Sequence, residues 1–360
     1  MKRSASLLVL LLFLSFVLPA VSMPLVWAAE DSWDTRAPLP LSCWGVVAVN
    51  YKIYAIAGSG DYDNVTYSNN AVLEYDPDLD TWTLKNPMPI KRYSFALAAY
   101  QNKIYVIGEP DGLNQLYDPE TDTWENRTPM PTPRSQLHAN VVNNKIYLIG
   151  GMTGGPDSTV GLNEVYDPQT DTWSSAEPIP VPVDSYASAV VDDKIYVIGG
   201  SGPKPPDVNQ IYDPETNTWS NGAPIPNGVV DAAAGATSGV LAPKKIYVLG
   251  GRIDYDTWGT DINQIYNPGN DSWTTGTDMP IARYNLMVAV INDTLYAMGG
   301  GPYFNVQGTW TPENYQYIPI GYIPEFPSWT PLLITLVAVV AVIVIYRRSL
   351  RKQAQRRSGQ

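Results

Sequence analysis

Three arginines occupy one recurring place in the sequence, three residues after a Met-Pro pair. They are Arg92, Arg134 and Arg283. An arginine can bind a carboxylate through two parallel hydrogen bonds, so the pattern indicates a candidate site for a polar ligand. Comparable places carry two carboxylates and four aromatic residues, namely Asp184, Asp231, Trp44, Tyr93, Tyr186 and Tyr284. Together these nine side chains would suit a sugar or an acidic sugar, since aromatic rings stack on sugar faces.

The remaining reactive residue types are few. His138 is the one histidine, which excludes a metal site built from several histidines, and no acid–base partner stands near it in the sequence. We interpret it as packed rather than catalytic. Cys43 is the one cysteine, so no internal disulfide can form, and we expect a buried or channel thiol.

Two further patterns are weaker. Asp61 with Asp63, and Asp254 with Asp256, alternate in predicted loops and could offer oxygen ligands to calcium. Solvated turn residues are the favoured interpretation, and we predict neither a bound metal nor a cofactor. The sequons at Asn64, Asn126, Asn270 and Asn292 would accept glycans if exported proteins are glycosylated in this organism.

The elements that must position these residues are repeated. A β-run typified by Lys145–Ile149 recurs at intervals of roughly 50 residues, the period of a propeller blade. Its copies begin at Lys52, Lys103, Lys194, Lys245 and Thr294. A tryptophan recurs with the same period, as Trp33, Trp82, Trp124, Trp173, Trp219 and Trp273.

One unit shows how each repeat supplies four strands. The expected strands are 137–142, Lys145–Ile149, 163–166 and 172–174. Asn143-Asn144 is a tight turn of the kind that tolerates positive φ, and Asp167-Pro168 begins another turn because proline pre-sets the backbone torsion. The first strand is apolar and small in every unit, as expected for the crowded innermost strand of a blade.

These residues resemble the kelch family. The blade signature Ile-Tyr-x-Ile-Gly-Gly, Tyr-Asp-Pro-x-Thr-Asp-Thr-Trp, Pro-Met-Pro-x-x-Arg runs from about Ser32 to Ile318. The resemblance implies an all-β propeller over residues 30–318, and the count of six β-runs and six tryptophans predicts six blades. It also implies a second role for the arginines, because the kelch arginine often holds loop carbonyls rather than ligand. Departures include Ala57-Gly58 and Gly108-Glu109, which lack the full glycine pair.

The order of the repeats predicts how the ring closes. Trp33 precedes the first of the six β-runs, and no such tryptophan follows the last unit. The strand around Trp33 should therefore complete the sixth blade, which removes a free sheet edge.

Loop lengths predict the working face. The connections on one face are short and uniform, whereas those on the other are long and varied, namely 58–70, 151–162, 200–208, 252–261 and 301–313. Varied loops on a rigid scaffold are the usual place for function.

Both ends of the chain predict export and anchoring. Residues 1–29 have the charge and apolar run of a signal peptide. Residues 319–328 would be a linker, 329–346 a transmembrane helix and 347–360 a basic cytoplasmic tail. The topology would be single-pass with the propeller outside the cell. Pro324-Glu325-Phe326-Pro327 before the span resembles the PEF-type sorting signals of archaeal surface proteins, which implies a possible processing of the tail. A plain anchor is the alternative.

The charge of the chain and its resemblance to the kelch family together limit the functions that we predict. Without the eight basic residues of the two ends, 15 basic residues face 35 acidic ones, which disfavours nucleic acid as a partner. We predict a cell-surface binding or adhesion module for a carbohydrate or a protein. The alternative is an enzyme similar to sugar-acid mutarotases or epimerases, with an axial pocket lined by arginine and carboxylate. Copper radical oxidases of kelch type are excluded, because a single histidine cannot supply their ligands.

Overall fold

The protein is described by a computed structural model that covers residues 29–62, 65–109, 111–155, 158–202, 206–253, 258–302, 310–323, 339–340, 343–345 and 347–348. The chain divides into two compact units, Met1–Tyr322 and Ile323–Gln360. Within the first unit, the described strands form six antiparallel sheets of four strands each. Each sheet is one blade.

The blades follow the chain in order. Blade 1 contains β2 (Gly45–Val49), β3 (Lys52–Tyr62), β4 (Val65–Asp76) and β5 (Thr81–Lys85). Blade 2 contains β6 (Phe95–Tyr100), β7 (Lys103–Gly108), β8 (Leu113–Asp118) and β9 (Thr123–Arg127). Blade 3 contains β10 (Ala139–Val142), β11 (Lys145–Ile149), β12 (Asn163–Asp167) and β13 (Thr172–Ser175).

The second half of the ring repeats the pattern. Blade 4 contains β14 (Ala187–Val191), β15 (Lys194–Ile198), β16 (Asn209–Asp213) and β17 (Thr218–Asn221). Blade 5 contains β18 (Ala233–Ala236), β19 (Ile246–Leu249), β20 (Asn263–Asn267) and β21 (Ser272–Thr275). Blade 6 contains β22 (Met287–Ile291), β23 (Thr294–Met298), β24 (Asn314–Ile318) and, as its outer strand, β1 (Ser32–Arg36).

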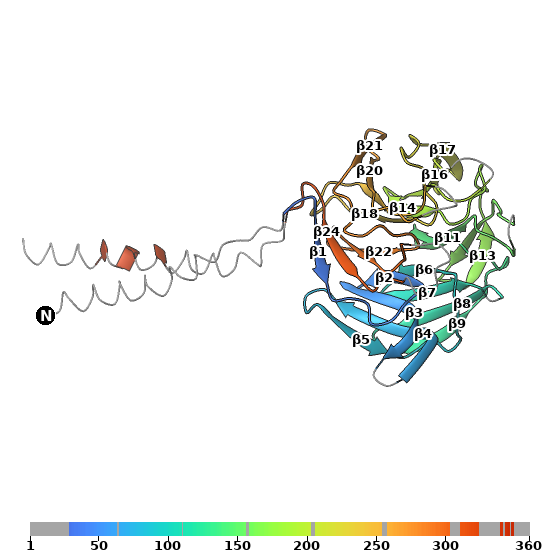
Figure 1. The fold of residues 1–360 in the computed structure, drawn as a ribbon, viewed down its shortest axis with the longest axis horizontal. Helices are drawn as coiled ribbons and strands as arrows, with labels where there is room; N and C mark the ends of the chain where they lie inside the picture. The colour runs from blue at the N-terminus through green and yellow to red at the C-terminus, as the bar shows by residue number, and fades with distance from the viewer. Residues whose placement is uncertain are drawn as a thin grey trace, which may run out of the picture. The chain divides into compact units, whose positions relative to one another are not determined.

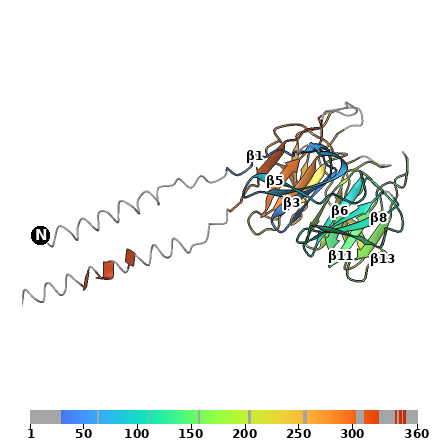
Figure 2. The same ribbon diagram turned by 90° about the horizontal axis from the view of Figure 1, so that it is seen from below.

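The N-terminal strand closes the ring. β1 pairs antiparallel with β24, and Trp33 stands opposite Tyr317. Figure 1 shows the first strands β2, β6, β14, β18 and β22 around the centre and the last strands at the periphery. The view turned by 90° shows β1 at the outer edge of its blade (Figure 2). The predicted six-bladed propeller and its closure by the N-terminal strand are therefore confirmed.

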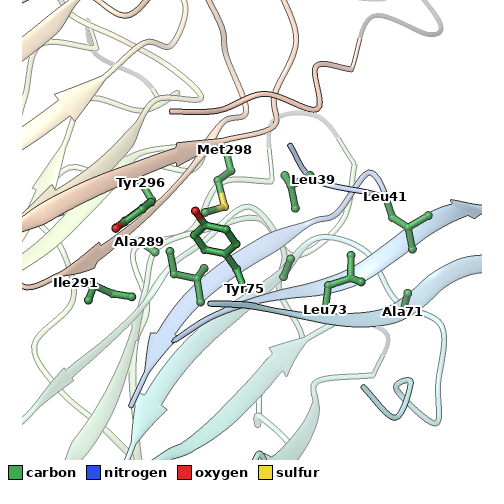
Figure 3. Packing of buried hydrophobic residues seen from close by; sticks show 11 residues of the cluster. Leu39, Leu41, Ala71, Leu73, Tyr75, Ala289, Ile291, Tyr296 and Met298 are labelled. Atoms are coloured by element: carbon green, nitrogen blue, oxygen red, sulfur yellow. The ribbon is translucent and has the colours of Figure 1, made fainter. Parts of the chain in front are cut away.

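The core lies between neighbouring blades. Second strands such as β11 and β15 are nearly all buried, which fits their continuous apolar sequence. At the joint of blades 6 and 1, Tyr75 packs with Leu73 from one side and with Tyr296 and Met298 from the other (Figure 3). Burial of apolar surface at six such joints holds the blades together.

A polar latch also joins each blade to the preceding one. In blade 3, the Asp171 carboxylate accepts a hydrogen bond from Thr128 N–H at 2.9 Å and another from the Tyr166 hydroxyl. Trp173 Nε1 donates to the Thr128 carbonyl at 2.9 Å. Five other blades use Asp31, Asp80, Asp122, Asn217 and Asp271 as the acceptor. The recurrent tryptophans all donate to the preceding blade.

Two connections differ from expectation. The predicted loop 58–70 is largely a continuation of β3 and β4, with Gly60 opposite Tyr67, because its Val65-Thr66-Tyr67 run favours strand. In blade 5 the connection between the first two strands is a longer loop, 237–245. It is held by Asp293, whose carboxylate accepts backbone N–H groups from Ser238 to Ala242.

The predicted end segments fall mostly outside the described residues. The signal peptide, apart from Ala29, has no described residue, nor does the Pro-Glu-Phe-Pro motif, and of the predicted span only residues 339–340 and 343–345 are described, as helix. No helix within the described ranges is both long and apolar enough to cross a membrane.

Candidate functional site

A belt of polar residues surrounds the axis where the blades begin. Its members lie one to three residues before the start of each first strand: Cys43, Ser94, Gln136, Ser185, Asp231 and Asn285. Five of them have positive φ, from 51° at Asn285 to 58° at Asp231. That backbone region is uncommon for residues other than glycine and is enriched in Asn and Asp.

Hydrogen bonds between blades fix part of this belt. Ser185 N–H donates to the Gln136 carbonyl at 3.0 Å, and Asp231 N–H donates to the Ser185 carbonyl at 2.8 Å. Asn285 N–H continues the series to the Asp231 carbonyl at 2.8 Å. The side chains are therefore presented from a backbone that is already ordered before any ligand arrives.

The belt rings an axial cavity of about 540 Å³, to which all six blades contribute. This volume lies within the range of small-molecule sites, about 300–1,000 Å³. The cavity opens on the face that carries the varied loops, since Ser59, Gly300 and Gly301 at the starts of those loops line it. We call this opening the axial mouth.

Four of the nine candidate residues line the cavity: Trp44, Tyr186, Asp231 and Tyr284. Tyr93 lies beside it, with its ring centroid 5.9 Å from that of Trp44. Trp44 Nε1 lies 3.4 Å from Asn69 Oδ1, which orients the indole. Ligand binding by these residues stays a prediction.

The three arginines are not among the cavity-lining residues. Their exposed fractions are 1% for Arg92 and 0% for both Arg134 and Arg283. Arg92 donates to the Leu113 and Val106 carbonyls. Burial lowers the pKa of Arg92 and Arg283 to about 10, so both stay charged at neutral pH.

The other two arginines make similar contacts. Arg283 donates to the Gly299 and Glu313 carbonyls at 3.0 and 3.1 Å. Arg134 donates to the Gly150 carbonyl and pairs with the Glu164 carboxylate, each at 3.0 Å. These contacts match the structural alternative, in which the arginine holds the turn after the second strand, and they leave the guanidinium groups away from the mouth.

A different arginine, which sequence reasoning missed, contacts two residues that line the cavity. Arg252 Nε donates to Asp231 Oδ2 at 3.1 Å, and its guanidinium lies 5.2 Å from the Tyr284 ring centroid. Burial raises the pKa of Asp231, and Arg252 counteracts that shift. Asp184 is also buried and accepts hydrogen bonds from Thr159 and Ser185. Arg252 could have been found as the charged residue that directly follows a glycine pair.

The other titratable groups of the cavity are held in protonated or neutral forms. Burial raises the pKa of the Cys43 thiol to about 12, and this thiol lies 3.6 Å from Met287 Sδ. Burial also raises the pKa of Tyr186 to about 12, and its hydroxyl donates to the Ile149 carbonyl. His138 also lines the cavity, with its ring edge-on to that of Tyr186. Its side chain is exposed, so the prediction that it is packed is wrong.

No group of three His, Cys, Asp or Glu side chains that could hold a metal ion occurs among the described residues. Of the four aspartates considered for calcium, Asp63, Asp254 and Asp256 lie outside the described parts of the chain, and Asp61 belongs to β3.

Comparison with protein families matches two parts of the propeller. Residues 109–301, more than half of the chain, match the family described as the KLHDC2/KLHL20/DRC7 Kelch-repeats domain. Residues 40–89 match the Kelch motif.

Similar proteins include "Kelch repeat and BTB domain-containing protein 12" of Homo sapiens, 36% identical over 86 residues. The mouse "Kelch repeat and BTB domain-containing protein 13" is 35% identical over 88 residues. Each match covers 22% of this chain, and it spans only 14% and 18% of those relatives. The solved structure of YjhT has a TM-score of 0.63 and 19% identity, covering 78% of this chain and 95% of that one. At that identity the likeness shows the fold alone.

Proposed function

Because the chain belongs to the kelch-repeat family of propellers, we propose that it is a binding module whose partner, a protein or a carbohydrate, enters the axial mouth. Kelch-repeat propellers typically bind protein partners. We further propose that the module is anchored in the cell membrane with its propeller outside the cell.

The observation that carries the proposal is the preorganised mouth. Five blades present polar side chains from left-handed backbone positions around one cavity. Trp44 and Tyr93 remain 51% and 58% exposed at its edge. Binding energy commonly concentrates in a few aromatic anchors surrounded by polar contacts, and an ordered site loses less entropy when a partner binds.

The cavity favours binding over proton transfer. General acid–base catalysis works best with a group whose pKa lies near the working pH. Here the Cys43 thiol and the Tyr186 phenol are held protonated, and Asp231 is paired with Arg252. The mutarotase-like alternative depended on arginines at the mouth, and Arg92, Arg134 and Arg283 are used inside the fold instead.

The two ends of the propeller support the proposed orientation. Gly321 N–H donates to the Glu30 carboxylate at 2.8 Å. Asp31 N–H donates to the Ile318 carbonyl at 2.8 Å. Both ends therefore leave on the face opposite the mouth, which would let an anchor hold the mouth away from the membrane.

The test compares the two faces. Cell-surface material of the source organism would be bound to the immobilised full-length protein, and the affinity of each binder measured with Trp44→Ala and with Tyr51→Asn. Tyr51 is 71% exposed in a turn on the opposite face. We expect Trp44→Ala to weaken binding by about tenfold or more and Tyr51→Asn to leave it unchanged. Equal affinity of wild type and Trp44→Ala would refute the proposal.

A further inference from the structure

The axial mouth has two chemically different halves. On one half, Trp44 of blade 1 and Tyr93 of blade 2 form an exposed aromatic pair, with ring planes tilted by 44°. Trp310, on the loop of blade 6, continues the aromatic lining into the cavity. Large aromatic rings left exposed together at a cavity edge mark an interaction site.

The other half presents hydrogen-bonding groups, and the Asp231 carboxylate among them is paired with Arg252. Gln136, Ser185 and Asn285 offer amide and hydroxyl groups that both donate and accept. These three residues lie in the part of the belt where backbone hydrogen bonds link blade 3 to blade 4, blade 4 to blade 5 and blade 5 to blade 6. A ligand with several hydroxyl groups on one side and a face of C–H groups on the other would satisfy both halves together.

Charge decides which ligand of this shape fits. The three arginines that would have attracted an acid are buried behind the mouth, and Arg252 is already paired with Asp231. No lysine or arginine is among the described residues that line the cavity, and the charge of the Asp231 carboxylate is offset by Arg252. An anionic ligand would therefore find no cation there to bind. The formal charge of the whole chain, −12, also disfavours an anionic ligand.

We infer that the axial mouth binds the uncharged end of a glycan, a neutral mono- or disaccharide unit stacked on Trp44 with its hydroxyls bonded to the belt. The cavity of about 540 Å³ has room for such a unit. This inference rests on the proposed function and names the ligand class of the same site.

Calorimetry with the full-length protein in mild detergent tests the ligand class. The neutral probes are maltose, N,N′-diacetylchitobiose and methyl mannoside, and the acidic probes are glucuronic acid and N-acetylneuraminic acid. We expect at least one neutral probe to bind at least about tenfold more tightly than either acid. Trp44→Ala should weaken that binding about tenfold or more, Trp44→Phe should weaken it less, and Gln136→Ala should also reduce it.

Two controls keep the outcomes distinct. Tyr51→Asn should bind the neutral probe like the wild type, and an unchanged unfolding midpoint should show that each mouth variant is folded. Tighter binding of an acidic probe, or no binding of any neutral probe, overturns the inference. If a surface protein then binds in a manner that depends on Trp44, the proposed function stands although the inference about a neutral glycan is wrong. If no binder of any class depends on Trp44, the proposed function and the inference about the glycan are both wrong.

Discussion

Arg134 and Glu164 form a buried ion pair that the neighbouring blade 4 lacks. The places of Arg134 and Glu164 are taken by Val183 and Gln210 in blade 4. Arg134→Val alone would leave the Glu164 carboxylate buried without a cation, which typically costs about 3–5 kcal/mol. Arg134→Val with Glu164→Gln would recreate the neutral arrangement of blade 4, so we expect a smaller loss. Urea unfolding of both variants measures the difference.

The matched control is Lys91→Ala, since Lys91 is exposed beside Arg92 and should leave the free energy of unfolding unchanged. If Arg134→Val unfolded like the wild type but no longer bound a ligand that the wild type binds, Arg134 would be a ligand-binding residue rather than a structural one.

At the scale of single residues, the sequence predicted which part of each repeat surrounds the axial cavity better than it predicted which side chains line that cavity. The starts of the first strands do surround the cavity, as the repeat predicts, and Trp44 and Asp231 do line it. Arg134 precedes the belt residue Gln136 by only two positions. The intervening backbone geometry directs the guanidinium under the second strand instead, and such geometry cannot be read from residue spacing.

The glycine that ends the second strand in five of the six blades, where blade 1 has Ala57, tests the fold at the scale of one element. Gly199 has φ of 66°, and a Cβ there would meet the Val229 carbonyl oxygen at 2.4 Å. That carbonyl already accepts the Gly200 N–H at 2.8 Å. Gly199→Ala should therefore cost about 1–3 kcal/mol through strained backbone, with more if the joint between blades 4 and 5 must shift. Thermal and urea unfolding measure the loss.

Gly154 supplies the comparison, because a Cβ there would meet nothing within 4 Å. Gly154→Ala should change the unfolding free energy by less than about 0.5 kcal/mol. Equal stability of the two alanine variants would contradict a packing role for the glycine pair.

Most strands and turns of the propeller were predictable from the sequence because they recur in every blade, and the two connections that were not predicted occur only once. A repeated unit carries its strand, turn and latch residues in each copy, so six weak patterns reinforce one another. Blade 1 extends its β3–β4 hairpin beyond this pattern, and blade 5 lengthens one turn around Asp293. Features present in a single copy have no such reinforcement and were missed.

At the scale of the whole molecule, closure of the ring depends on the N-terminal strand β1. β1 supplies the outer strand of blade 6 and the latch to blade 5, where Asp31 accepts Thr277 N–H at 2.7 Å and Trp33 Nε1 donates to the Thr277 carbonyl. On the other side, Ala37 N–H donates to Asp80 of blade 1 at 2.8 Å. Deleting residues 31–37 would thus release two of the six joints and expose the edge of β24.

We expect the full-length protein without residues 31–37 to self-associate, since an unpaired strand edge is a template for another chain. Light scattering after size-exclusion chromatography would detect the oligomers. A synthetic peptide of residues 30–37 should restore the monomer by occupying the vacant edge, whereas a peptide with the same residues in scrambled order should not, because Asp31 and Trp33 must face Thr277 together. A deletion variant that remains monomeric with an unaltered unfolding midpoint would show that the ring holds without its closing strand.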